Sequence, residues 1–431
     1  MYSNVIIFGD SQSDIGNVPC SDILVDVEKT KKQEGQTVDG VINQILSNLS
    51  YVPVSNPVNP HNKSFKVPGS DEVFKHPDIS SLNSHKYSLP LLNGCNRESA
   101  SVNWTQYFMN MAYDNGLIKD KDIAPWGWLY DKTENEKRKF DNISINYSWC
   151  GAQSNDDCRH VVYFKKPWKI PFDSKENPLS LEDVFNRQKK FRKNPVQIDY
   201  LHDLAIPGTC RQIKIFNDDV HNGRVNVNND TLYIVWTGAN DIGNVFNELT
   251  EGSLTSLPKR WKNFNKDKLS GKLPELAVNT LNELIKSPTK TKNIIVLSQY
   301  NIGMLPMIGN ILGKFKLNFK YSRQIIASIL SKGAENYNRY LEMKVDELNR
   351  QSDFNIVFID LLPIFNKLSK KGCIFNRKFG RSFMSDNVDK LTKGQGAEIS
   401  DYLFWDSQHL SSLGQQVIAY QVYNCIKQNK T

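Results

Sequence analysis

Four short runs rich in β-branched and aromatic residues constrain the fold more than any other feature of this sequence. They lie at residues 5–8, 232–236, 293–297 and 354–359, and 143–147 is a weaker fifth candidate. The runs are continuous rather than alternating, which is typical of strands that are covered on both faces of a sheet. Because helical segments separate them, we predict an α/β fold with a five-stranded parallel sheet and helices on both faces.

Segments with the spacing of amphipathic helices account for much of the remaining chain. In the longest of them, apolar residues from Ile326 to Leu348 recur on one face. The predicted helices cover residues 99–116, 274–285, 322–348 and 412–426. Since the sequence has no internal repeat and no low-complexity linker, we expect residues 1–431 to form a single domain.

Two long segments lack a clean periodic pattern and are predicted to be insertions. Residues 18–93 are polar and rich in Pro, Ser and Asn, which is typical of a long loop. Residues 153–208 are polar, basic and interspersed with aromatic side chains. Cys158 and Cys210 bracket the second insertion and are placed to close its base with a disulfide. The alternative is that all seven cysteines are free thiols in a cytosolic protein.

Composition and charge narrow the class of protein. With 39% hydrophobic and 23% charged residues, the sequence is typical of a globular protein. The net charge of +8 favours an anionic partner, either membrane phospholipid or nucleic acid. Neither zinc-like cysteine spacing nor a nucleic-acid-binding motif accompanies the charge, so we do not expect nucleic acid. No signal peptide precedes the first strand, so the chain is either cytosolic or a mature form with a start methionine added.

Ser11 stands on a turn at the carboxyl end of the first predicted strand. Gly9–Ser11 turn sharply out of the strand, and Ser13 and Asp14 offer a helix start. A serine in this position can be held exposed and rigid, as a catalytic nucleophile must be. The alternative is an ordinary turn, so the prediction depends on whether the chain also supplies a base, an orienting acid and an oxyanion hole.

Two turns that contain glycine supply candidate oxyanion donors. Asn240 follows a predicted strand, and Gly238 allows the tight turn that aims the amide N–H of Asn240 at a developing oxyanion. Gly151 follows the weaker strand candidate and, having no side chain, can present its backbone N–H closely to a ligand. The alternatives are plain turns, with Asn240 or Asp241 capping the next helix.

Asp406 and His409 are three residues apart, just before the closing helix. Within one tight turn, Asp406 can fix the tautomer of the imidazole, and His409 can take the proton from Ser11. The alternative for His409 is a surface residue at a helix start. The candidates follow the chain order Ser, Gly, Asn, Asp, His, each at a strand end or a helix start, and together they favour catalysis by Ser11.

This set of residues resembles the sequence blocks of the SGNH, or GDSL, family of esterases and lipases. Phe8–Ser11 match the first block, with Gln12 where the family name has leucine. Residues 146–152, 238–241 and 406–409 are similar to the second, third and fifth blocks. The similarity runs from end to end of the chain and is interrupted by the insertions.

Within the family, the chain is most similar to the bacterial phospholipase A and glycerophospholipid–cholesterol acyltransferase branch. Phe404–Asp406 and Arg97–Trp104 carry this similarity. The second of these segments departs from the branch, because Asn96 and Ser101 replace its two glycines. Cys150 also stands where the second block often has a glycine, which would place a thiol beside the oxyanion hole.

The resemblance implies a three-layer α/β/α sandwich and ester hydrolysis through an acyl-enzyme. Ser11 would attack, His409 would be the base and Asp406 would orient it. The backbone N–H groups of Ser11 and Gly151 and the side chain of Asn240 would hold the oxyanion. No metal or organic cofactor is required.

The branch implies phospholipid or lysophospholipid as the substrate, acyl transfer to a sterol such as cholesterol, and a secreted protein. The basic insertion at 153–208 would then meet a membrane surface or cover the site as a lid, while a solvated loop explains its composition equally well. Two other hypotheses stay open. One is a small-ester or carbohydrate esterase on the same scaffold, and the other is a protein that holds lipid without catalysis.

Overall fold

The structure is a computed structural model of the 431-residue chain. The residues that it describes are 1–15, 24–26, 64–67, 70–75, 103–126, 143–149, 151–155, 158–164, 200–243, 257–263, 271–287, 293–306, 308, 320–351, 354–370, 403–404 and 409–429. Within these ranges, no helix combines the length and the apolar character that a membrane crossing requires.

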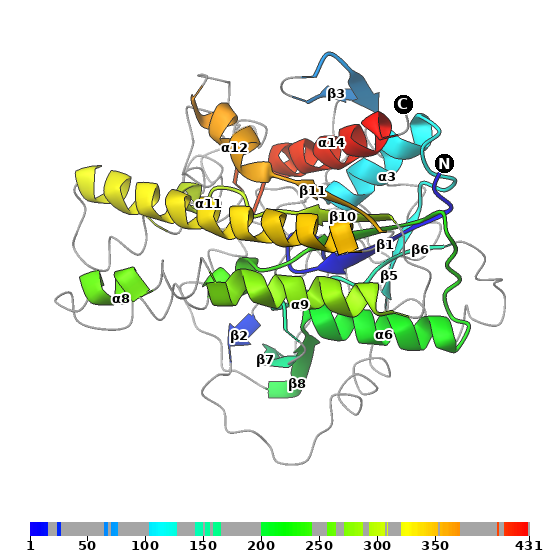
Figure 1. The fold of residues 1–431 in the computed structure, drawn as a ribbon, viewed down its shortest axis with the longest axis horizontal. Helices are drawn as coiled ribbons and strands as arrows, with labels where there is room; N and C mark the ends of the chain where they lie inside the picture. The colour runs from blue at the N-terminus through cyan, green and yellow to red at the C-terminus, as the bar shows by residue number, and fades with distance from the viewer. Residues whose placement is uncertain are drawn as a thin grey trace, which may run out of the picture.

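A parallel sheet of six strands forms the centre of the molecule, in the order β11-β10-β9-β1-β6-β5 (Figure 1). Its strands are β1 (Asn4–Gly9), β5 (Ile123–Pro125), β6 (Ser144–Asn146), β9 (Thr231–Trp236), β10 (Asn293–Leu297) and β11 (Asn355–Ile359). All five predicted strands are present. The sixth, β5, escaped prediction because a three-residue edge strand is too short to show a period.

The sheet changes its direction of growth at β1. From β1 the chain adds β5 and β6 on one side, and then β9, β10 and β11 on the other. Gly9 pairs with Trp236 and Ile7 pairs with Asn146, so the loops that follow β1, β6 and β9 leave the sheet side by side. Ligands in open α/β sheets bind beyond the carboxyl ends of strands at such a switch point.

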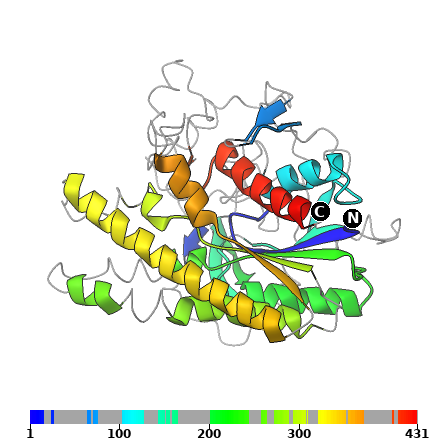
Figure 2. The same ribbon diagram turned by 45° about the horizontal axis from the view of Figure 1, so that its top comes forward.

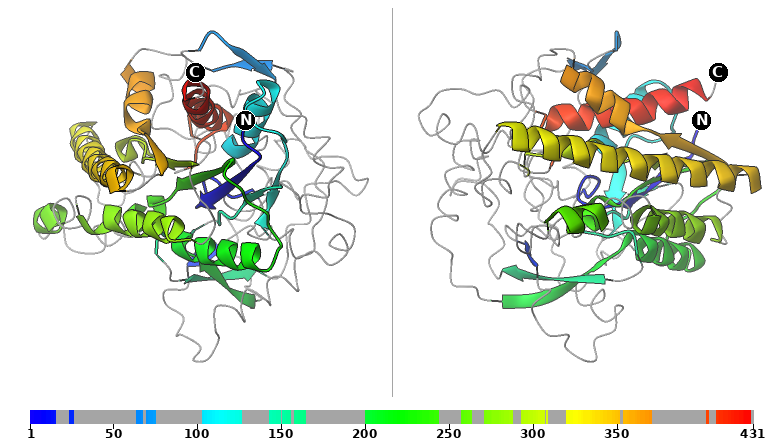
Figure 3. Two further views of the ribbon diagram at one scale, coloured as in Figure 1. Left: turned by 45° about the vertical axis from the view of Figure 1, so that its right-hand side comes forward. Right: turned by 60° about the vertical axis from the view of Figure 1, so that its left-hand side comes forward.

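Helices cover both faces of the sheet, and Figure 2 shows the sheet between the two helix layers. On one face, α3 (Trp104–Asp114) packs against α14 (Ser412–Gln428). On the other, α9 (Leu273–Ile285) packs against both α6 (Thr209–His221) and α11 (Lys320–Gln351), as Figure 3 also shows. The shorter elements are α8 (Leu257–Asn263), the 3-10 turn η5 (Ile302–Met304) and α12 (Leu361–Lys370). The predicted helices are all present, whereas α6, α8 and α12 were not predicted.

The helix boundaries and faces follow from the local sequence. Asn103 caps α3 by accepting from the backbone N–H of Thr105, and Gln106 completes a capping box. On α11, the buried positions recur at helical spacing and include five residues of the predicted apolar stripe. They are Leu330, Ala334, Tyr337, Leu341 and Val345.

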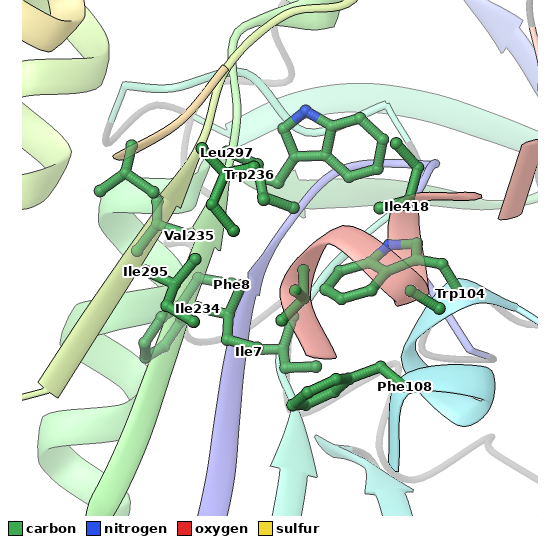
Figure 4. Close-up of a cluster of buried hydrophobic side chains, with 14 of the residues drawn as sticks. Ile7, Phe8, Trp104, Phe108, Ile234, Val235, Trp236, Ile295, Leu297 and Ile418 are labelled. Atoms are coloured by element: carbon green, nitrogen blue, oxygen red, sulfur yellow. The ribbon is translucent and has the colours of Figure 1, made fainter. Parts of the chain in front are cut away.

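Aromatic side chains connect the sheet to both helix layers (Figure 4). The ring of Phe8 lies 5.5 Å from that of Phe216 in α6. The indole of Trp236, one register position further along, lies 6.1 Å from that of Trp104 in α3. Successive strand residues face opposite sides of a sheet, so one stretch of β1 and β9 contributes to both halves of the core. Each fully buried side chain of this size contributes roughly 1.5–3 kcal/mol to stability.

Both predicted insertions contain strands that the sequence did not reveal. Strand β7 (Cys158–Phe164) pairs antiparallel with β8 (Tyr200–Pro207), and β2 (Leu24–Asp26) adds to the other edge of β7. A separate hairpin consists of β3 (Ser64–Lys66) and β4 (Val73–Lys75). The expectation of loops without regular structure was therefore wrong for these residues. The strands of the first group are far apart in the sequence, so no turn signal announces their pairing.

The predicted disulfide between Cys158 and Cys210 stays a prediction. Cys158 opens β7 and Cys210 lies in the first turn of α6, but the side chain of Cys158 falls outside the described residues.

Candidate active site

Ser11 lies in a tight turn directly after β1, which we call the nucleophile turn (residues 10–14). The backbone N–H groups of Ser13 and Asp14 both donate to the carbonyl of Asp10, each at 3.0 Å, and so close the turn around Ser11. Ser11 itself is 9% exposed, so it is accessible from one side only. A Cβ atom on Gly9 would lie 2.6 Å from the carbonyl oxygen of Trp236, which explains the glycine before the turn.

Side chains from three other elements hold the nucleophile turn in place. Gln212 of α6 forms two hydrogen bonds with the backbone of Gly9, accepting at 3.0 Å and donating at 2.9 Å. Asn146 donates to the carbonyl of Ser13 at 2.7 Å, and Trp104 donates to the Ser13 hydroxyl at 3.1 Å. The turn is thus braced from both faces of the sheet. Gln212 was missed from the sequence because α6 was not predicted, and because a polar residue in an amphipathic helix usually faces solvent.

The loop after β9, residues 237–241, is called the oxyanion loop here because it carries Asn240. Gly238 has a φ of 108°, which glycine adopts far more readily than other residues. The amide of Asn240 donates to the carbonyl of Ala152 at 2.9 Å. An asparagine amide carries two N–H groups, so this bond fixes the plane of the amide and the second N–H can donate to a ligand.

Gly151, the other predicted side of the oxyanion hole, lies in the turn before Ala152. Its φ is 81°, and the turn is closed by the N–H of Ala152, which donates to the carbonyl of Trp149 at 3.0 Å. The bond between Asn240 and Ala152 ties this turn to the oxyanion loop. Gly151 is therefore next to the site, although it does not itself line the pocket that contains Ser11.

His409 is brought to the site by a short antiparallel connection in front of α14. Phe404 pairs with Leu410, and the N–H of Ser411 donates to the carbonyl of Leu403 at 2.9 Å. His409 is 5% exposed and lines the same pocket as Ser11. The predicted orienting acid, Asp406, lies outside the described residues, so its role stays a prediction.

Asp10 is a buried carboxyl group at the base of the site, a role that was not predictable from its place in the turn alone. It is 2% exposed, and burial raises its pKa to about 7. The backbone N–H of Gln12 donates to Oδ1 at 3.0 Å, which acts against this rise in pKa. The nearby His409 and the N–H of Ala239 also lower the pKa, whereas the charge of Asp241 raises it.

Asp241 anchors the far end of the oxyanion loop. Its carboxylate accepts from both the backbone N–H and the hydroxyl of Ser154, each at 2.9 Å. Burial raises the pKa of Asp241, and these two bonds act in the opposite direction. The carbonyl of Ser154 in turn accepts from the hydroxyl of Thr280 in α9 at 2.6 Å. The loop that carries Asn240 is therefore fixed to the turn that follows β6 and to a helix.

Ser11, Asn240 and His409 line a single pocket at the carboxyl end of the sheet. The pocket contains about 690 Å³ of empty space, including the part open to solvent. Beyond these three residues the lining includes the polar side chains of Gln12, Gln299 and Tyr300 and a larger apolar group. The apolar side chains belong to Ile242, Ile302, Leu305, Ile308 and Leu330. Among the described residues, no group of three His, Cys, Asp or Glu side chains is placed to hold a metal ion.

A comparison with protein families identifies a relationship that fits this geometry. The family model for GDSL-like lipases and acylhydrolases matches residues 134–422, about two thirds of the chain. The chain belongs to this family. This GDSL hydrolase therefore has the SGNH hydrolase fold, and it is an ester hydrolase of the lipase and esterase type. A comparison with curated proteins finds no match.

The family match covers only part of the candidate site of this GDSL hydrolase. It includes Gly151, Asn240, Asp406 and His409, and it begins after Ser11. The assignment of Ser11 consequently depends on its position, at the end of β1 and in one pocket with Asn240 and His409.

Proposed function

We propose that this GDSL hydrolase is a lipolytic enzyme, a phospholipase A or lysophospholipase, that works through an acyl-enzyme on Ser11. The observation that carries the proposal is the pocket, in which Ser11 and His409 share a wall with side chains such as Ile302, Leu305 and Leu330. Aliphatic carbons gain roughly 0.8 kcal/mol per methylene when they leave water for such a wall. An acyl chain is therefore a better occupant of the apolar part of the pocket than a sugar, whose hydroxyl groups would lack partners along those aliphatic side chains.

The mechanism follows from the arrangement of the polar groups. The Ser11 hydroxyl attacks the ester carbonyl while His409 takes its proton. The oxyanion that forms is held by the Asn240 amide and by the backbone N–H groups of Ser11 and Gly151. When the intermediate collapses, the imidazolium of His409 gives its proton to the departing alcohol. Water then enters, loses a proton to His409 and releases the fatty acid from Ser11.

The acceptor and the setting of the reaction are further parts of the proposal. A sterol such as cholesterol takes the place of water when the acyl group is transferred rather than hydrolysed. The net charge of +8 supports contact with an anionic phospholipid surface. We propose that the protein is secreted and that the reaction takes place outside the cell, in keeping with the branch that the sequence resembles.

Fatty-acid release from a defined panel tests the proposal. The panel consists of a phospholipid, a lysophospholipid and an acetylated sugar, each with and without cholesterol. We expect release from the two lipids, a cholesteryl ester when cholesterol is present, and a loss of at least about 1,000-fold in Ser11→Ala. Ser328→Ala, an exposed serine on α11, is the matched control and should retain activity. Preference for the acetylated sugar would reject the lipolytic assignment, and lipid hydrolysis by Ser11→Ala would reject the nucleophile.

A further inference from the structure

We propose that Asp10 is a positioning residue of the active site, whose buried carboxylate joins the nucleophile turn to the oxyanion loop and stabilises the positive charge that forms on His409. The inference rests on the Ser11 and His409 chemistry proposed above and goes beyond it. It assigns no contact with substrate to Asp10, which acts through the residues that make such contacts.

The hydrogen bonds of Asp10 connect two parts of the site that are far apart in the sequence. Its Oδ1 accepts from the N–H of Gln12 at 3.0 Å, directly after the nucleophile. The N–H of Ala239, directly before the oxyanion donor Asn240, also faces this carboxylate and favours its ionised form. One buried carboxylate therefore interacts both with the turn that carries the attacking oxygen and with the loop that carries the group that stabilises the oxyanion. A shift of about 1 Å between such groups can lower a rate by roughly 100-fold.

The charge of Asp10 is also placed to act on the general base. His409 becomes an imidazolium as it takes the proton from Ser11, and its charge interacts with that of Asp10 across the buried base of the site. An opposite charge nearby stabilises an imidazolium, and burial weakens the screening of that interaction by water. Asp10 therefore favours the transition state over the resting state, in which His409 is neutral.

Other titratable groups face Asp10 and define when it carries its charge. Among the described residues they are His409 in front of α14, Asp241 in the oxyanion loop and Tyr337 of α11. Asp241 disfavours a second negative charge, and Tyr337, whose pKa is raised by burial and by both carboxylates, stays neutral. Burial is the largest influence and brings the pKa of Asp10 to about 7. As the pH falls, Asp10 thus loses its charge in the same pH range in which an ordinary histidine, with a pKa of about 6.5, gains one.

The proposal predicts a specific form of the pH dependence. The active enzyme must have lost two protons, one from Asp10 and one from His409, and the two losses belong to the pair as a unit. Below about pH 6 the logarithm of kcat/KM should therefore rise with a slope of two. In Asp10→Asn the slope should be one, because a single proton remains to be lost.

The variant Asp10→Asn tests the proposal in hydrolysis of p-nitrophenyl butyrate from about pH 5 to about pH 9. We expect kcat at the alkaline end to fall roughly 10- to 100-fold with KM within about twofold, since asparagine offers one acceptor oxygen in place of two. The matched control is Asp218→Asn, an exposed aspartate of α6, which should keep the rate and the slope of the wild type. Urea unfolding of both variants establishes that they are folded.

Each result decides the question. An Asp10→Asn enzyme with the wild-type rate, or a slower one that keeps a slope of two, would overturn the proposal. Should the variant fail to fold, the wild type alone is sufficient, because a slope of one below about pH 6 contradicts a requirement for ionised Asp10. The substrate is not a lipid, so failure of this test leaves the phospholipase assignment standing, and failure of the lipid panel leaves this one standing.

Discussion

Replacing Gly238 by alanine should damage both the stability and the activity of this GDSL hydrolase. The residue has a φ of 108°, so a side chain there adds roughly 1–3 kcal/mol of backbone strain. The new Cβ would lie 2.2 Å from the hydroxyl oxygen of Tyr337 and 3.0 Å from its Cζ, and such overpacking adds about 1–3 kcal/mol. We therefore expect Gly238→Ala to lower the free energy of unfolding by about 2–6 kcal/mol. Its kcat should fall as well, because the strain lies two residues before Asn240.

Urea unfolding of a double-mutant cycle measures the steric part of this effect. Tyr337→Phe removes the closest contact, so Gly238→Ala should be less harmful in that background by about 1–3 kcal/mol. Gly223→Ala is the control for strain alone, since Gly223 has a φ of 68° and an added Cβ would meet nothing within 4 Å. If Gly238→Ala is no more harmful than Gly223→Ala, or if Tyr337→Phe restores nothing, the reasoning about this contact is wrong.

Three further predictions concern single side chains. Tyr337→Phe alone should leave the free energy of unfolding unchanged or raise it by about 1 kcal/mol in urea unfolding, because the buried hydroxyl has no hydrogen-bond partner among the described residues; a loss above about 2 kcal/mol would contradict this. In the wild type the free energy of unfolding should fall by roughly 2–3 kcal/mol between about pH 5 and pH 8, and Asp10→Asn should abolish this fall, which urea unfolding at both pH values would detect. Leu330→Trp should place a larger side chain in the apolar part of the pocket. The value of kcat/KM should then fall roughly 10-fold or more for esters of long acyl chains and stay within about twofold for acetyl esters. Equal losses for both kinds of ester would place the acyl chain elsewhere.

The sign of the Asp10 effect follows from the direction of its pKa shift. A carboxyl group whose pKa is about 7 in the folded protein binds its proton more tightly there than in the unfolded chain, where its ordinary value is 3.8. Stability is therefore greatest below the lower value and falls as the pH rises through the higher one. Asparagine cannot titrate, so a variant that keeps the wild-type pH dependence would show that Asp10 is not the group responsible.

The fold was predictable where a single element carries its own signal. The strands around Ile7, Ile234 and Ile295 are continuous apolar runs, and each was found close to its predicted place. The stripe on α11 was equally clear, because five of its members are buried at helical spacing. The three-residue strand β5 and the pairing of β7 with β8 were not predictable, since the first is too short for a period and the second depends on residues distant in the sequence.

The same distinction applies to the candidate site. The convergence of Ser11, Asn240 and His409 on one pocket was predictable, because each follows a recognisable strand or precedes a recognisable helix, and in a parallel sheet such positions converge. Asp10 and Gln212 are of another kind. Their roles depend on partners from distant elements, Ala239 for one and Gly9 for the other, and on burial that no local pattern records. Sequence reasoning thus located three residues that line the pocket and missed the residues that hold the surrounding loops.

The difference between the predictable and the unpredictable residues has a physical basis, because several buried polar groups that lower stability lie beside the candidate site. The base of the site holds two buried carboxyl groups, Asp10 and Asp241, and a buried hydroxyl on Tyr337 without a partner among the described residues. Each of them lowers stability relative to an apolar side chain of the same shape. All of them adjoin the oxyanion loop, beside the point where the sheet changes its direction of growth. Concentrating these groups at one place is expected of a site in which charge must be stabilised at the moment of reaction, and the rest of the sheet, built from strands such as β9 and β10, provides the stability that offsets them.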